Sequence, residues 1–152
     1  MSTVHTYGVV AADIAVRFAD YPEGFTAATL PTAVQVGALI TSMSSEVTGA
    51  LYAQGLDPTT VEADAHAISW CAETLILGVS WQVSLLLRGI SANRNNPYRE
   101  QYEKRLQQLQ LTPTCLGDAG GGQVLLTTDM LNPDVGVNVH YDFLRSERDK
   151  WL

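Results

Sequence analysis

Three side chains that can bind a metal ion lie close together in the sequence: Glu62, His66 and Glu73. Spacings of four and seven residues place them on one face of a helix, and carboxylate and imidazole groups are ligands of zinc and similar ions. The HExxH motif and a second nearby histidine are both missing from this stretch. We therefore predict no metal and no cofactor, and keep a small helical metal-binding protein as an alternative.

Cys71 is the clearest candidate for a nucleophile, because a thiol needs only a neighbouring base to be activated. The three histidines that could supply this base are scattered along the chain: His5, His66 and His140. Cys71 lies beside Trp70 in an apolar segment, so we expect it to be a small buried hydrophobic residue. Together with the lack of any other convergent polar group, this predicts no catalytic residues and a protein that is not an enzyme.

The cysteines also indicate the compartment. Cys71 and Cys115 are far apart and form no CxxC motif, so neither a disulfide framework nor a zinc site is expected. The first ten residues contain no Lys or Arg and no apolar run, so they lack the parts of a signal peptide. We expect synthesis in a reducing cytoplasm.

A glycine-rich run, Asp118–Gly122, could bind an anion through its backbone amides. The Gly-Lys-Ser/Thr of a phosphate-binding loop does not follow it, and the next residues alternate as in a strand. A hinge is the favoured interpretation of this run.

Charge is distributed unevenly along the chain. The net charge of -7 disfavours a protein whose main task is to bind nucleic acid phosphates. Residues 88–110 are nevertheless basic, with five Lys and Arg against two Glu. Arg88, Arg94 and Arg99 lie near Tyr98 and several asparagines, which can contact phosphates. Because three arginines are few, we favour a solvated helix junction or a salt-bridge surface for an acidic partner.

Helices are expected to position these residues. Apolar spacing predicts a short helix over Val10–Phe18 and a second helix over residues 31–54, which Gly55 ends. The inward stripe of the second helix is Val36, Ile40, Met43, Val47 and Leu51. The turn at residues 57–60 predicts a third helix to about Arg88, capped by a threonine and with two acidic residues in its first turn. Its expected apolar face is Val61, Ala65, Ile68, Ala72, Leu75, Val79, Val83 and Leu86.

The third helix contains the most apolar stretch, Ala65–Leu87, which is long enough to cross a membrane. Polar residues interrupt it: His66, Ser69, Glu73, Ser80, Gln82 and Ser84. A buried or interface helix therefore explains it better, and we predict no membrane association. A small membrane-active protein that uses residues 65–87 as a span remains an alternative. Trp70 and Trp81 are expected to be core or interface anchors on nearly the same helix face.

The predicted fold class is mostly α. A fourth helix from Asn96-Pro97 to about Gln110 completes a small bundle of about four helices, and it presents one apolar side: Tyr98, Tyr102, Leu106 and Leu109. Residues 1–110 form the expected helical core, and residues 111–152 an extended C-terminal arm. Alternation within 123–128 and 136–143 predicts one or two short β-strands in this arm.

The order and length of these elements resemble the head-to-tail connector (adaptor) proteins of tailed bacteriophages. The resemblance rests on YGVVAADIAVRF at 7–18 and on LPTAVQVGALITSMSSEVTGALYAQGLDP at 30–58, followed by a long third helix. The matching positions are Tyr7, Asp13, Ile14, Phe18, Ile40, Ser42, Val47, Leu51 and Gly55. As a pattern of helices, the resemblance covers about residues 4–110.

The resemblance implies a structural protein of the virion neck. Such a protein forms a homo-oligomeric, usually dodecameric, ring beneath the portal and joins the capsid to the tail. Its partners would be the portal protein and the next neck or tail-completion protein. Genomic DNA would pass through the ring without sequence-specific binding. The candidate subunit or portal interface residues are Trp70, Trp81, Arg94, Tyr98, Arg99, Val137, Val139, Tyr141, Phe143 and Trp151.

Overall fold

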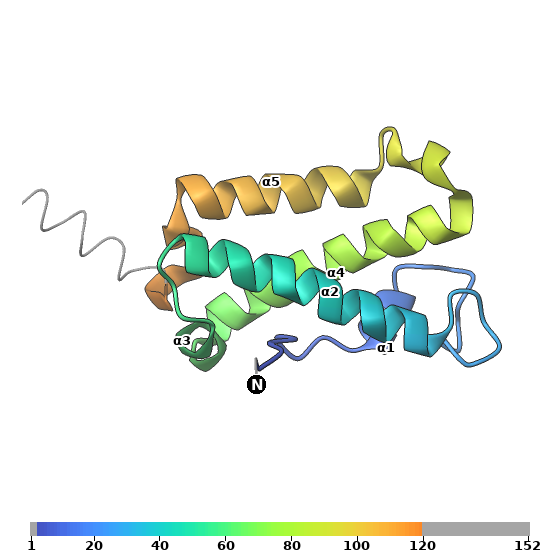
Figure 1. The fold of residues 1–152 in the computed structure, drawn as a ribbon, viewed down its shortest axis with the longest axis horizontal. Helices are drawn as coiled ribbons and strands as arrows, with labels where there is room; N and C mark the ends of the chain where they lie inside the picture. The colour runs from blue at the N-terminus through green and yellow to red at the C-terminus, as the bar shows by residue number, and fades with distance from the viewer. Residues whose placement is uncertain (1–2, 120–152) are drawn as a thin grey trace, which may run out of the picture.

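Three long helices that lie alongside one another dominate the fold (Figure 1). The computed structural model describes residues 3–119. Its elements are α1 (Ala11–Ala15), α2 (Ala33–Ala53), α3 (Pro58–Ala63), α4 (Ala65–Arg88), the 3₁₀ turn η1 (Ile90–Asn93), α5 (Pro97–Leu111) and the 3₁₀ segment η2 (Pro113–Ala119). The mostly helical class is confirmed, and residues 3–119 contain no strand. The predicted strands at 123–128 and 136–143 lie outside the described residues, as do Val137, Val139, Tyr141, Phe143 and Trp151.

The first two helices are set by local signals. In α1 the Asp13 carboxylate accepts a hydrogen bond from the Val10 amide at 2.8 Å, but the helix ends at Ala15, before the predicted Phe18. At the start of α2 the Thr32 hydroxyl accepts from the Gln35 amide, and the Gln35 side chain accepts from the Thr32 amide. The predicted inward stripe of α2 is confirmed, since each of its five residues is buried.

The predicted third helix is two helices. Asp64 is extended (φ -99°, ψ 122°), and its carboxylate accepts a hydrogen bond from the Ala67 amide at 2.7 Å. Asp57, rather than a threonine, caps α3 by accepting from the Thr59 amide at 3.0 Å. The single helix predicted from the turn at 57–60 is therefore wrong at Asp64, because a short carboxylate there satisfies backbone amides better as a cap than within a helix.

α4 is the central helix, in contact with every other helical element of the described chain. Because it is covered on more than one side, Thr74 and Leu77 are buried together with Leu75, Val79 and Val83. The predicted apolar face is wrong at both ends of α4, since Ala65 is exposed and Leu86 is 57% exposed. By length and mean hydropathy (1.4) α4 could cross a membrane, but 56% of its apolar window is buried inside the protein.

α5 begins as predicted, and the core continues beyond it. The Asn96 side chain accepts hydrogen bonds from the amides of Tyr98 and Arg99. After α5, η2 packs against α4 and α5, and Leu116 is fully buried. The helical core therefore extends past residue 110, at least to Ala119.

Candidate functional site

The connection between α4 and α5 turns sharply at one end of the molecule (Figure 1). α4 ends because Gly89 adopts φ 74° and ψ -178°, a conformation that other residues rarely adopt. Asn95 has φ 57°, in the left-handed region that asparagine tolerates best among residues with a side chain. These two residues set the path of the segment that follows Arg88 and carries Arg94.

A groove of about 730 Å³ lies between this connection and the residues after α1. Buried side chains line its base: Phe18, Ser84 and Asn96. The Asn96 amide donates to the Ser84 hydroxyl at 2.6 Å, which joins the start of α5 to the end of α4. Charged residues lie along its edge: Arg17, Asp20, Arg88 and Arg94.

A second hollow of about 640 Å³ lies next to the first. Ser91, Arg94 and Asn95 line both hollows, and Ile90 and Arg99 line only the second. Arg94 therefore stands between two recesses.

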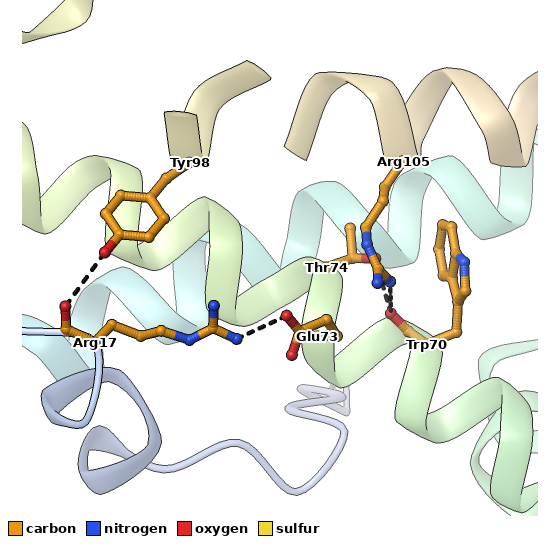
Figure 2. Close-up of polar contacts among 6 residues, drawn as sticks. All are labelled: Arg17, Trp70, Glu73, Thr74, Tyr98 and Arg105. Carbon is orange, nitrogen blue, oxygen red and sulfur yellow. Dashed lines mark hydrogen bonds and ion pairs between the residues drawn. The ribbon is translucent and has the colours of Figure 1, made fainter. Parts of the chain in front are cut away.

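The arginines at this end differ in how their charges are compensated. Arg17 forms an ion pair with Glu73 at 2.7 Å, and its carbonyl accepts a hydrogen bond from the Tyr98 hydroxyl at 3.2 Å (Figure 2). Arg99 forms an ion pair with Glu103 at 2.7 Å. Arg88 and Arg94 are exposed, and within residues 3–119 neither has an ion-pair partner. Among the described residues, nothing compensates these two charges, so both guanidinium groups could bind an anionic group.

Apolar side chains are exposed next to these arginines. Ile90 is 89% exposed and Leu86 is 57% exposed. Exposed apolar groups gathered beside charged ones are typical of protein interaction sites.

The two tryptophans are engaged within the chain. The Arg105 guanidinium lies 5.5 Å from the Trp70 ring and donates to the Trp70 carbonyl at 3.3 Å (Figure 2). Arg99 lies 5.7 Å from the Trp81 ring, whose indole donates to Asn93 at 3.1 Å. Both rings are half-buried, so they anchor α5 and its connection to α4.

The structure does not bring the three possible metal ligands together. His66 is within 3.1 Å of the Cys115 carbonyl, and Glu73 pairs with Arg17. Glu62 lies on α3, beyond the break at Asp64, and is 3.1 Å from His5 Nδ1 without hydrogen-bond geometry. Among the described residues, no group of three His, Cys, Asp or Glu side chains could hold a metal ion.

Cys71 is fully buried, as predicted. Burial raises the pKa of its thiol from 9.0 to about 12, with smaller contributions from Cys115 and Glu62. Because the thiolate is the nucleophilic form, the raised pKa and the full burial of Cys71 both disfavour nucleophilic reaction of this thiol at neutral pH.

Sequence reasoning identified one side of the groove and missed the other. Arg88, Arg94 and Tyr98 belong to the predicted basic stretch and do line it. Arg17, Phe18 and Asp20 line the opposite side, and no local signal pointed to them, because they meet the basic stretch only through tertiary packing.

Comparison with family models, curated proteins and solved structures finds no match.

Proposed function

We propose that this chain is a structural subunit of a tailed-bacteriophage virion, a head-to-tail connector. In this proposal it forms a ring beneath the portal, joins the capsid to the tail and surrounds the DNA channel. The observation that carries the proposal is the α4–α5 end of the bundle, where Arg88 and Arg94 have no ion-pair partner among residues 3–119 and lie beside exposed Leu86 and Ile90. Such a surface suits assembly with another protein better than conversion of a small substrate.

The positions that carry the resemblance to connectors support the proposal through their structural roles. Ile14, Val47 and Leu51 are fully buried, and Tyr7 is 3% exposed. Gly55 follows α2 with a φ of 70°, a conformation that favours glycine. The resemblance is thus one of core packing and helix order, which are the properties that a shared scaffold preserves.

The charge of the chain is compatible with a DNA channel. A lining with many arginines would hold DNA through phosphate contacts, whereas an acidic protein lets it slide. The net charge of -7 and the small number of free cations in the described residues fit this requirement. The proposed partners are further copies of the chain, the portal protein and the next neck or tail-completion protein. The proposed location is the virion neck.

Disruption of the gene in the phage that encodes the chain tests this function. Negative-stain electron microscopy of the lysate is expected to show unjoined tails beside heads that have lost DNA. Supplying the intact gene from a plasmid should restore joined particles, which controls for effects on neighbouring genes. Normal infectious virions from the disrupted phage would contradict the connector assignment.

A membrane-active protein is the second candidate, and the length and hydropathy of α4 favour it. It requires α4 to leave the core in which Leu75, Val79 and Val83 are fully buried. Flotation with phospholipid vesicles tests this candidate. Co-flotation of the purified chain with the vesicles would support a membrane role, and a chain that stays at the bottom of the gradient would contradict it.

A further inference from the structure

The groove at the α4–α5 end has a lining whose charges and apolar side chains suit one particular kind of partner segment. We propose that this groove and the adjoining hollow form a docking site for an acidic segment of a partner protein, a segment that alternates carboxylate and apolar side chains. The proposal stands whether or not the chain is a phage connector, because it rests on the chemistry of this surface alone.

Charge complementarity supports an acidic occupant. Arg17, Arg88 and Arg94 line the groove, and Asp20 is the single carboxylate among its described lining residues. Arg17 is already paired with Glu73, whereas Arg88 and Arg94 lack ion-pair partners within residues 3–119. A guanidinium group binds a carboxylate through two parallel hydrogen bonds, so each free arginine can hold one acidic side chain.

The apolar part of the site supports a peptide rather than a nucleic acid. Ile90 lines the second hollow at 89% exposure, and Phe18 lies at the base of the first. A polyanion with no apolar side chains would leave Ile90 in water. Nucleic acid binding also draws on many phosphate contacts, and a chain with a net charge of -7 offers few cations for them.

The base of the site is held in place before any ligand arrives. The hydrogen bond from Asn96 to Ser84 and that from Tyr98 to the Arg17 carbonyl join α5, α4 and the residues after α1. Asn96 also caps α5. A site whose framework is already ordered loses less entropy on binding.

Fluorescence anisotropy with a labelled peptide of alternating Glu and Leu tests the proposal, using the full chain. The peptide is expected to bind, and binding should weaken when salt is raised, because the exposed charges are screened. The double variant Arg88→Glu/Arg94→Glu is expected to lose about tenfold or more in affinity. The matched control is Lys104→Glu, which reverses an exposed cation of α5 outside both hollows and should bind as the parent does.

Two further variants sharpen the test. Ile90→Ser should weaken the Glu/Leu peptide without changing its salt dependence, since it removes only an apolar contact. The double variant should instead bind a Lys/Leu peptide, because its charges are reversed. Thermal melts verify that each variant is folded.

Other occupants are outcomes that overturn the proposal. A labelled DNA duplex that binds more tightly than the Glu/Leu peptide, and that loses affinity in the double variant, would assign the groove to nucleic acid. A change in self-association of the double variant by analytical ultracentrifugation, without peptide binding, would assign it to a second copy of the chain. Equal peptide binding by the parent and the double variant would leave the groove without the proposed role.

Discussion

At the scale of single residues, burial controls which protons the chain can release. Tyr7 is 3% exposed, and burial raises the pKa of its hydroxyl from 10.0 to about 12, although the hydrogen bond with Thr48 lowers it in part. Burial also raises the pKa of Tyr102, whose hydroxyl donates to Glu46 at 2.9 Å. Both groups, like Cys71, are therefore neutral in the folded state at pH values where they would ionise in the unfolded chain.

The first prediction concerns alkaline stability. The folded pKa values of Tyr7 and Cys71 lie above the unfolded values, so both groups ionise more readily in the unfolded chain. Their contribution to the free energy of unfolding is therefore fully present below about pH 9 and is lost as the pH rises toward 12. Each pKa unit corresponds to about 1.4 kcal/mol, so the ionisation of Tyr7 contributes at most about 2 to 3 kcal/mol to the loss of stability. Urea unfolding at a series of pH values measures the decline.

Tyr7→Phe isolates one contribution to this decline. The variant should be less stable by about 1 kcal/mol at neutral pH, because it loses the hydrogen bond with Thr48, yet its stability should fall less steeply above pH 10. Tyr52→Phe removes a hydroxyl from a 61% exposed residue and, with it, the smallest of the charge contributions that raise the Tyr7 pKa, so this comparison variant should lie much closer to the parent than Tyr7→Phe does. An unchanged slope in Tyr7→Phe would contradict the assigned cause.

At the scale of helices, a single glycine sets how closely α4 approaches its neighbours. A Cβ atom on Gly78 would lie 2.7 Å from Met43 Cε and 2.9 Å from Tyr102 Cε2, both closer than van der Waals contact. The Met43 side chain can move, but the Tyr102 ring is held by its hydrogen bond to Glu46. Gly78 therefore permits the close packing of α2, α4 and α5.

The second prediction follows from this packing. Gly78→Ala should destabilise the protein by about 1 to 2 kcal/mol, because overpacking outweighs the gain in helix propensity. Gly49→Ala, in α2 with no neighbour within 4 Å of the added Cβ, should instead gain up to about 1 kcal/mol. Midpoints of urea unfolding compare the two variants. Equal stability of both would mean that the Tyr102 ring moves at little cost.

At the scale of the whole molecule, the segment after α5 belongs to the same core as the long helices. Leu116 of η2 is fully buried, and the neighbouring Cys115 carbonyl is 3.1 Å from His66 Nε2. Contacts of η2 with α3, α4 and α5 tie it to the opposite end of the molecule from the arginine-lined groove (Figure 1).

The third prediction is that Leu116 contributes to global stability. Leu116→Ala should cost about 2 to 5 kcal/mol, as expected for a buried leucine. Leu111→Ala, at a 75% exposed position only five residues earlier, should change stability by less than about 0.5 kcal/mol. A small effect of Leu116→Ala, measured by urea unfolding, would mean that η2 opens independently of the bundle.

Helix placement in the described chain was largely determined by the sequence. The capping pair of Thr32 and Gln35, the Asn96 cap and the inward stripe of α2 depend on hydrogen bonds and spacing within a few residues, so they can be predicted locally. The break at Asp64 is also local in origin. The break was missed because an acidic residue is typical both of an N-cap and of the first turn of a helix. Asp64 alone therefore does not show whether a new helix begins there or an earlier one continues.

The tertiary structure alone decided which part of the α4 surface stays exposed and where the candidate site lies. Leu86 belongs to an apolar stripe by spacing, yet it is 57% exposed, because no neighbouring element of the described chain covers this side chain. Tyr98 and Arg17 are 81 residues apart and meet through a hydrogen bond that borders the groove. Such pairs depend on how helices pack, and the periodicity of one helix contains no information about the partner that will cover it.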